Sequence, residues 1–168
     1  MLKLIRLGLL TIGIILPLIV CSCSKRPATG SYDIEFGKRL GPLSFDMTKA
    51  QIQDVLGKPS FQRDKVLNYN ERGFTIFLNK KGTIVSIVCG SMDGDTNLIS
   101  HFRGASNKGI TLGALSEDII KAYGQPTETR DDKTFYRYES LSSDFVFKDN
   151  RVICFVLRPK SNGQANER

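Results

Sequence analysis

Apolar and polar residues alternate along the chain with two different periods, first that of a helix and then that of strands. Ile52, Val55 and Leu56 fall at positions i, i+3 and i+4, which places them on one face of a helix. Residues 48–51 form a capping box before this segment, and Gly57 stands where the helix would end. The pattern predicts one short amphipathic helix that packs a single face against a core.

Runs of β-branched and aromatic residues follow this helix, and each run is bounded by turn-forming residues. Short runs of this composition are typical of strands. We expect strands at 66–69, 74–78 and 83–89, with a hairpin turn at 80–82. The helix and these strands would form one helix-plus-meander unit.

The same order of elements returns at a spacing of 67 residues. Ile52 matches Ile119 and Gly57 matches Gly124 at this spacing, and Ser116 is expected to cap the second helix. The apolar face of that helix would be Ile119, Ala122 and Tyr123, and the strands that follow are expected at 134–138, 144–147 and 151–157, with a turn at 148–150.

These patterns predict an α+β fold of two tandem repeats, each a short helix or helical pair followed by an antiparallel three-stranded meander. A lone meander is marginally stable, so the two copies are expected to share sheet edges or faces and complete one core. The expected organisation is a signal peptide at 1–22, a lipidated N-terminus and flexible tether at 23–39, a first repeat at 40–91, a connector at 92–108, a second repeat at 109–159 and a disordered tail at 160–168.

The start of the chain combines a basic segment with an apolar run that stops at two cysteines. The apolar run, residues 7–20, is shorter than the about 20 residues that a membrane-spanning helix needs. The Cys-Ser-Cys-Ser sequence that follows resembles the processing site of bacterial lipoprotein signals. Because such signals carry a small residue before the modified cysteine, we expect cleavage after Ser22 and lipidation of Cys23, with Cys21 as the alternative.

This resemblance also implies a location for the mature protein. Residue 24 is serine rather than aspartate, which in enterobacterial lipoprotein signals favours the periplasmic face of the outer membrane over retention at the inner membrane. Several acyl chains, palmitate among them, would hold the protein on the membrane through its N-terminal lipid. Removal of residues 1–22 leaves 146 residues with a net charge of about +5.

The distribution of charged residues does not identify a partner. The formal net charge of the full chain is +7, but the basic residues are scattered and acidic residues lie among them. This pattern is typical of a solvated surface, and it leaves attraction to anionic lipid or to an acidic partner open. The expected compartment and the absence of a basic recognition motif argue against nucleic-acid binding.

Residues 109–126, GITLGALSEDIIKAYGQP, resemble the helix-and-turn signature of small bacterial proteins related to the β-lactamase inhibitor protein. They are similar also to the BamE-like (SmpA/OmlA) lipoproteins of the outer-membrane β-barrel assembly machinery. The resemblance extends at motif level over about residues 40–157, although the first copy has Leu56 where the second has Tyr123. It implies an α+β domain that binds other proteins or stabilises an assembly, and it carries no catalytic residues to this chain.

Few residues offer the chemistry that a catalytic site needs. His101 is the only histidine of the sequence, and no nucleophile elbow of the G-x-S-x-G type is present. Residues 93–97 have the spacing that opens a calcium loop, but Leu98 stands where that loop needs glycine. We therefore expect no catalytic residues, no metal site and no cofactor.

Cys89 and Cys154 lie on the final predicted strands of the two repeats. The chain has no C-x-x-C motif and lacks the further ligands of a closed zinc site. An oxidising envelope permits a disulfide between these cysteines, and two buried free thiols fit the sequence equally well. Both interpretations stay open at this point.

Tyr136 and Tyr138 alternate onto one face of a predicted strand, with Phe135 on the other face. Core packing accounts for each residue alone, but the tyrosine pair could also expose aromatic area that anchors a partner, which makes it the candidate partner-binding site. The sequence thus predicts an envelope lipoprotein that acts as a non-catalytic protein-binding module, either an assembly factor or an inhibitor. The alternatives are an envelope hydrolase with an unrecognised carboxylate site and a structural lipoprotein that binds cell-wall polymer.

Overall fold

The computed structural model describes residues 32–130 and 134–161. The predicted signal peptide, the candidate lipidation residues Cys21 and Cys23, and most of the predicted C-terminal tail lie outside the described residues. Among the residues that are described, no helix has the length and apolar composition that crossing a membrane requires.

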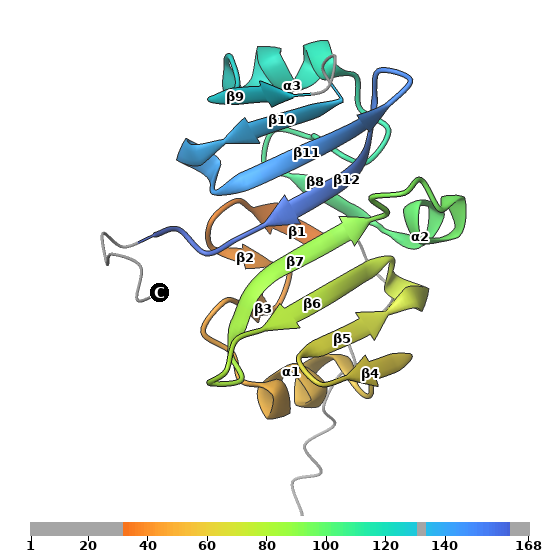
Figure 1. Ribbon diagram of the computed structural model, residues 1–168, viewed down its shortest axis with the longest axis vertical. Coiled ribbons are helices and arrows are strands. Elements are labelled where there is room, and N and C mark those ends of the chain that lie inside the picture. Colours follow the sequence, from red (N-terminus) through yellow and green to blue (C-terminus); the bar gives the residue numbers. More distant parts are fainter. Residues whose placement is uncertain (1–31, 131–133, 162–168) are drawn as a thin grey trace, which may run out of the picture.

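The fold is α+β, and most of its regular structure is strand (Figure 1). The described helices are α1 (Lys49–Leu56), α2 (Thr96–His101) and α3 (Ser116–Tyr123), with the 3-10 turns η1 (Asn70–Arg72) and η3 (Glu139–Leu141). The strands are β1 (Tyr32–Glu35), β2 (Arg39–Leu40), β3 (Leu43–Ser44), β4 (Phe61–Arg63), β5 (Val66–Tyr69), β6 (Phe74–Leu78), β7 (Ile84–Gly90), β8 (Gly104–Ser106), β9 (Glu128–Arg130), β10 (Phe135–Tyr138), β11 (Ser143–Lys148) and β12 (Arg151–Leu157).

Eight of these strands form one antiparallel sheet, here called the large sheet, in the order β4-β5-β6-β7-β12-β11-β10-β9. Strands β4 to β7 come from the first half of the chain and β9 to β12 from the second. The two sets join where β7 pairs with β12, with Val88 opposite Val156 and Ile87 opposite Leu157. Backbone hydrogen bonding is therefore continuous across the middle of the molecule.

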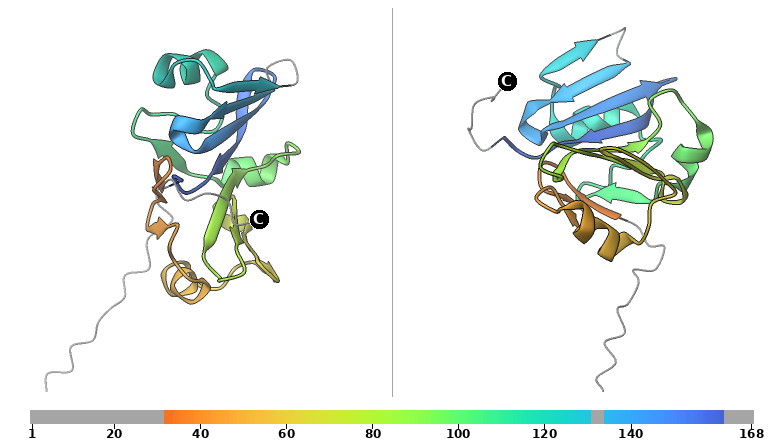
Figure 2. Two further views of the ribbon diagram at one scale, coloured as in Figure 1. Left: turned by 60° about the vertical axis from the view of Figure 1, so that its left-hand side comes forward. Right: turned by 60° about the horizontal axis from the view of Figure 1, so that its bottom comes forward.

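The other four strands form a small sheet in the order β3-β2-β1-β8, in which β1 and β8 are parallel. Figure 2 shows the small sheet, α1 and α3 on one side of the large sheet. Ring contacts join these layers: the ring of Phe36 lies 5.5 Å, between centroids, from Tyr123 of α3 and also 5.5 Å from Phe145 of β11. The main core thus lies between the large sheet and this covering layer.

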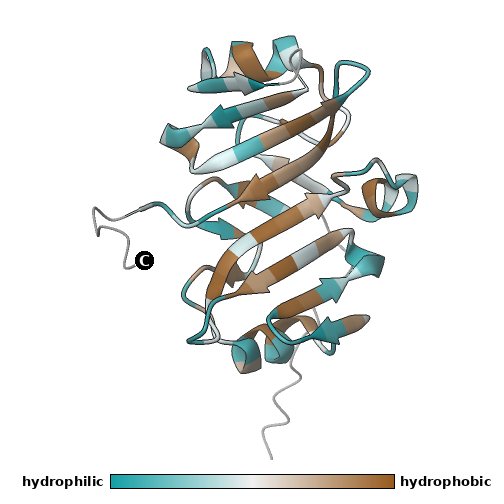
Figure 3. Cartoon of the chain, viewed as in Figure 1, coloured by the Kyte–Doolittle hydropathy of each residue, from teal (hydrophilic) through white to brown (hydrophobic). Residues whose placement is uncertain are grey.

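The core is built from aromatic and branched aliphatic residues. Hydrophobic residues concentrate on the central strands of the large sheet, and polar residues on its outer strands (Figure 3). The largest fully buried side chains are those of Tyr138, Phe74, Phe145, Phe155, Ile34, Leu40, Leu43, Ile52, Leu67, Ile76, Ile87 and Ile119.

The predicted helix starts agree with the structure in one case out of two. Thr48 caps α1 as expected, and its backbone N–H donates to Oε1 of Gln51 at 2.9 Å. Ser116 is not the cap of α3 but its first helical residue. Leu115 is the cap residue, and the carboxylate of Asp118 in the first turn accepts a hydrogen bond from its N–H at 3.3 Å. An acidic residue in this turn also complements the helix dipole.

The predicted strands at 66–69, 74–78 and 151–157 have the bounds found in the structure. The expectation of three strands after each helix is wrong, because β4 and β9 add a fourth strand at each edge of the large sheet. All three residues of β4 are exposed, so this strand carries no alternation of apolar and polar residues. A short edge strand of this kind leaves no periodic signal in the sequence.

The flexible tether predicted for 23–39 is wrong for its described part. Residues 32–35 are β1 and residues 39–40 belong to β2, with Ile34 and Leu40 buried in the core. In the small sheet β1 pairs with the neighbouring β2 and also with β8, about 70 positions later in the chain. Strands of two to four residues give a weak pattern in the sequence, and the pairing of β1 with β8 is distant in sequence.

Candidate protein-binding surface

One face of the large sheet points away from the small sheet, α1 and α3 (Figure 2), and we call it the open face. Paired residues in an antiparallel sheet share a face, so the strand register identifies its members. From one edge to the other these are Phe61, Arg63, Val66, Asn68, Thr75, Phe77, Ser86, Val88, Val156, Cys154, Val146, Asp144, Phe135, Arg137, Arg130 and Glu128.

The centre of the open face is largely apolar. Val88 of β7 lies between Thr75 of β6 and Val156 of β12, and Phe77 and Val146 lie on the same face. Val156 is buried, whereas Val88, Phe77 and Val146 are half-buried. Cys154, which lies on the same face, is buried too, so the solvent-exposed apolar area comes from Val88, Phe77 and Val146. Exposed apolar area marks surfaces at which proteins interact.

An aromatic side chain stands near each edge of the open face. Phe61 on β4 is 58% exposed. Near the other edge, the ring of Phe135 has two guanidinium groups over it, since the Cζ atoms of Arg130 and Arg137 each lie 5.4 Å from its centroid. Asn68 is paired with Phe61, and its buried Oδ1 has no hydrogen-bond partner in the described part of the chain. Aromatic residues and arginine are enriched among the residues with which proteins contact one another.

Five charged side chains form a connected network at the β9 end of the open face, in which Arg130 is paired with Glu128. Nε of Arg137 donates to Oδ1 of Asp144 at 3.0 Å, and its Nη1 donates to Oε2 of Glu128 at 3.1 Å. Arg158, which follows β12, donates through Nη2 to Oδ2 of Asp144. The carboxylate of Asp144 is buried and both arginines are partly exposed, so the network presents cationic groups to solvent.

Both carboxyl groups of this network favour the ionised form. Burial opposes ionisation of Asp144, but hydrogen bonds from Arg158 and Arg137 outweigh it and hold the pKa of this carboxyl below its usual value. A hydrogen bond from Arg130 lowers the pKa of Glu128. A cleft of about 310 Å³ lies beside Asp144 and Arg158. A general acid at neutral pH needs a raised carboxyl pKa, so the network has the character of ion pairing and not of an acid–base pair.

Tyr136 and Tyr138 share a face, as predicted, but it is the covered face. Both side chains are buried, and the hydroxyl of Tyr138 donates to the carbonyl of Gly124 at 2.9 Å. Burial raises the pKa of Tyr138 to about 12. The prediction that this pair binds a partner is therefore wrong, and Phe135 is the aromatic residue of this strand on the open face. Alternation assigns residues to two faces but does not say which face the rest of the chain will cover.

The structure also places the other candidate residues, Cys89, Cys154 and His101. Cys89 and Cys154 are free thiols and both are buried, which decides between the two interpretations of the sequence. His101 is the exposed last residue of α2, and Asp95 caps the same helix by accepting from the N–H of Asn97 at 2.8 Å. Within the described ranges, no three His, Cys, Asp or Glu side chains gather where they could hold a metal ion.

The sequence prediction missed the arginines and the aspartate of the charged network. Arg137 stands between two tyrosines and Asp144 precedes an aromatic run, so both occupy strand positions at which a charge is costly unless it is paired. Two opposite charges on neighbouring predicted strands are the signal that could have identified the pair. Arg158 lies beyond the end of β12, and only the folded chain brings it to Asp144.

Comparison with known proteins adds a single weak structural neighbour. No family model matches the chain, and no curated protein matches it. The crystal structure of a DUF4309 family protein (YjgB) from Bacillus subtilis resembles it with a TM-score of 0.43 and 16% sequence identity, over 67% of this chain and 78% of that chain.

Proposed function

We propose that this protein is a membrane-anchored envelope lipoprotein whose open face binds another protein without catalysing a reaction. The observation that carries the proposal is an eight-stranded sheet with one face covered and the other open, apolar at its centre and rich in arginine at one end. Such a surface combines the apolar area and the aromatic and arginine anchors of protein interfaces. Assembly factor and inhibitor are the two forms that this binding role would take.

The two halves of the large sheet, in this proposal, are tandem copies of one unit, a helix followed by four strands. Matching contacts support it. The hydroxyl of Tyr69 donates to the carbonyl of Gly57 at 3.0 Å, and that of Tyr138 donates to the carbonyl of Gly124 at 2.9 Å. Each tyrosine therefore ties the end of its helix to the second strand of its own unit. Joining two such units edge to edge gives a wider binding face than either has alone.

Affinity capture tests the binding role. The lipidated full chain is used to capture partners from solubilised envelope, beside two variants with the same kind of change, Phe61→Glu on the open face and Met92→Glu outside the large sheet. Phe61 and Met92 are similarly exposed, at 58% and 61%. We expect one partner at near-stoichiometric yield with the parent and Met92→Glu chains and its loss with Phe61→Glu. Identical captured proteins from all three chains would contradict the proposal.

Metabolic labelling with palmitate tests the anchor separately. We expect label on the parent chain and on Cys21→Ser, and none on Cys23→Ser. Loss of label in Cys21→Ser but not in Cys23→Ser would assign lipidation to Cys21. The absence of label on the parent chain would contradict lipid anchoring.

A further inference from the structure

A cleft of about 310 Å³ lies where β10 and β11 meet the chain that follows β12. Its lining includes Arg137, Asp144 and Arg158, together with Ser142 after η3 and Pro159. Arg137 and Asp144 are paired on the open face, so the cleft continues this face at the end of β11. Its volume is at the small end of the range that ligand sites have, and it suits one small group.

A buried carboxylate holds the two arginines of this cleft in place. The side chain of Asp144 is 3% exposed, and its two oxygens accept from Nε of Arg137 at 3.0 Å and from Nη2 of Arg158. A guanidinium whose orientation is already fixed loses little conformational freedom when it takes a further partner. The two cations therefore form a preorganised pair, unlike arginines and lysines whose side chains are held by nothing.

Both guanidinium groups keep donors for a further anion. A guanidinium has five N–H donors. Within the described part of the chain, Arg158 uses one of them, to Asp144, and Arg137 uses two, to Asp144 and Glu128. The side chains of Arg137 and Arg158 are 34% and 38% exposed, so a ligand from solvent can reach the donors that remain.

The charge balance of the network indicates which anion fits. Three arginines face two carboxylates, which leaves one net positive charge; the five residues are Arg130, Arg137, Arg158, Glu128 and Asp144. The arginine contacts lower the pKa of both carboxyl groups, so both are ionised at neutral pH. One further carboxylate neutralises the network, whereas a phosphate dianion would place excess negative charge beside Asp144.

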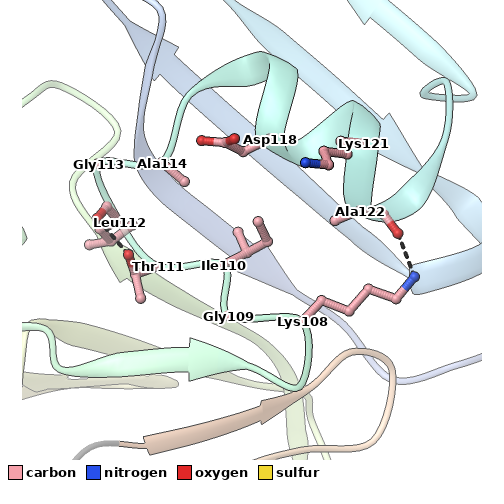
Figure 4. A pocket seen from close by; sticks show the side chains of 10 residues that line it. All are labelled: Lys108, Gly109, Ile110, Thr111, Leu112, Gly113, Ala114, Asp118, Lys121 and Ala122. Atoms are coloured by element: carbon pink, nitrogen blue, oxygen red, sulfur yellow. Dashed lines mark hydrogen bonds between the residues drawn. The ribbon is translucent and has the colours of Figure 1, made fainter.

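A wider cleft, of about 720 Å³, lacks this arrangement (Figure 4). It lies between residues 108–114 and α3, and its cations are Lys108 and Lys121. Nζ of Lys108 already donates to the carbonyl of Ala122, and across residues 32–130 and 134–161 neither lysine lies within ion-pair distance of a carboxylate. Ammonium groups are point charges without a planar fork, so this cleft has no preorganised receptor for a carboxylate.

We propose that the cleft beside Arg137 and Arg158 receives the carboxylate of a glutamate or aspartate side chain from the protein that binds the open face. This inference rests on the proposed function and adds the chemistry of the partner. The partner places apolar residues over Val88 and Phe77 and an acidic residue at the cleft, so that apolar area and charge match on the two sides. Because a planar carboxylate fits a guanidinium through two parallel hydrogen bonds, this contact also fixes the orientation of the partner.

Nuclear magnetic resonance of the arginine Nε–H groups tests the cleft without the partner. The full chain, isotopically labelled and held in detergent micelles, is titrated with acetyl-Val-Glu-Val-amide and with the neutral acetyl-Val-Gln-Val-amide. We expect the glutamate peptide to shift the signals of Arg137 and Arg158 saturably, and the glutamine peptide to need at least about a tenfold higher concentration. Arg63, exposed at the other end of the open face, is the internal control and should shift little.

Two matched substitutions locate the binding. Arg158→Lys keeps the positive charge and a donor for Asp144 but removes the planar fork, so it should weaken the glutamate peptide by at least about fivefold. Arg103→Lys, the same change at an exposed arginine beside β8, should leave the affinity within about twofold. In affinity capture, Arg158→Lys should lower the yield of the partner that Phe61→Glu loses, and Arg103→Lys should not.

The outcomes separate this inference from the proposed function. The absence of a saturable shift at Arg137 and Arg158, or an equal shift at Arg63, overturns the carboxylate site even where Phe61→Glu still loses a captured partner. Tighter binding of inorganic phosphate than of the glutamate peptide also overturns it, and assigns the cleft to a phosphate group instead. Peptide binding that depends on Arg158, in a parent chain that captures no partner, supports the carboxylate site and contradicts the binding role of the open face.

Discussion

Cys89 and Cys154 lie on adjacent strands with their side chains on opposite faces of the large sheet. Cys89 of β7 pairs with Phe155, whereas Cys154 of β12 pairs with Gly90, so the cysteines are one position out of step. Because successive residues alternate, the thiol of Cys89 points to the main core and that of Cys154 to the open face. A disulfide would need a one-residue shift of register, which would turn every side chain of one strand to the wrong face.

Both thiols are expected to resist modification in the folded protein. Burial raises the pKa of Cys89 well above its usual value, and burial together with the charge of Asp144 raises that of Cys154 to about 12, so neither forms thiolate at neutral pH. In a chain with Cys21→Ser and Cys23→Ser, a chromogenic thiol reagent should find two thiols after denaturation and almost none before it. Detection of fewer than two reactive thiols after denaturation, or a Tm lowered by reductant, would indicate a disulfide.

Removal of the charge of Asp144 should destabilise the fold. Asp144→Asn removes the negative charge and places an amide NH2 donor against one of the two arginines, so we expect a loss of about 1–3 kcal/mol in the free energy of unfolding at pH 7. Urea denaturation of the variant and parent measures this loss. Glu71→Gln, a change of the same kind at an exposed carboxylate, serves as the control and should have little effect.

The same substitution predicts a pH dependence. The folded pKa of Asp144 lies below its unfolded value of about 4, so its contribution is complete above that pH and is lost as the pH falls through the folded pKa. The difference in unfolding free energy between the parent and Asp144→Asn should therefore stay constant from about pH 5 to 8 and shrink below about pH 4. A difference that grew as the pH fell would contradict this account of the ion pairs.

Gly73 and Gly82 both have positive φ, at 70° and 79°, but only Gly73 is enclosed. A Cβ at residue 73 would lie 2.3 Å from the backbone nitrogen of Phe102 and 2.5 Å from the carbonyl oxygen of Leu98, whereas nothing lies within 4 Å of one at residue 82. Gly82→Ala should cost about 1 kcal/mol for the backbone conformation alone. Gly73→Ala should cost about 3 kcal/mol or more, because α2 must also move. Equal losses in thermal unfolding would show that α2 does not pack against Gly73.

Substitutions at Ile52 and Ile119 test whether the two halves of the large sheet share one core. Both are fully buried, on α1 and α3 respectively. Ile52→Ala and Ile119→Ala should each cost about 2–5 kcal/mol, and Val85→Ala, at a residue that is 40% exposed, should cost well under about 1 kcal/mol. Equilibrium denaturation followed by two probes should give one coincident transition for all of them. Two separated transitions would mean that the halves unfold independently and do not share one core.

The sequence predicted those parts of the fold whose signal is local. The capping box at Thr48 and the dense apolar runs of β5, β6 and β12 determine their own elements, because helix capping and strand alternation depend on neighbours in the chain. Strands β1, β2 and β8 are short, and although β1 pairs locally with β2, its other partner, β8, is distant in sequence. They become strands only when the small sheet assembles, so the sequence pattern predicts a tether and a connector instead.

For the candidate binding surface, too, the sequence predicted only the features that depend on neighbours in the chain. Alternation correctly placed Tyr136 and Tyr138 together and Phe135 opposite them. Which face stays open depends on where the small sheet and the helices pack, and that is a property of the whole fold. The pairing of Asp144 with Arg158 likewise forms only when the chain beyond β12 reaches β11. Local patterns therefore identified the strand but not which of its residues lie on the open face.

Site-specific photocrosslinking tests the central claim, protein binding at the open face, most directly. A photoreactive phenylalanine analogue replaces Phe77 at the centre of the open face in one chain and the exposed Glu117 of α3 in another, both in the lipidated protein in intact cells. We predict one discrete adduct with another envelope protein from residue 77, lost when Phe61→Glu is added, and none from residue 117. No adduct from residue 77, or the same adduct from both positions, would contradict binding through the open face.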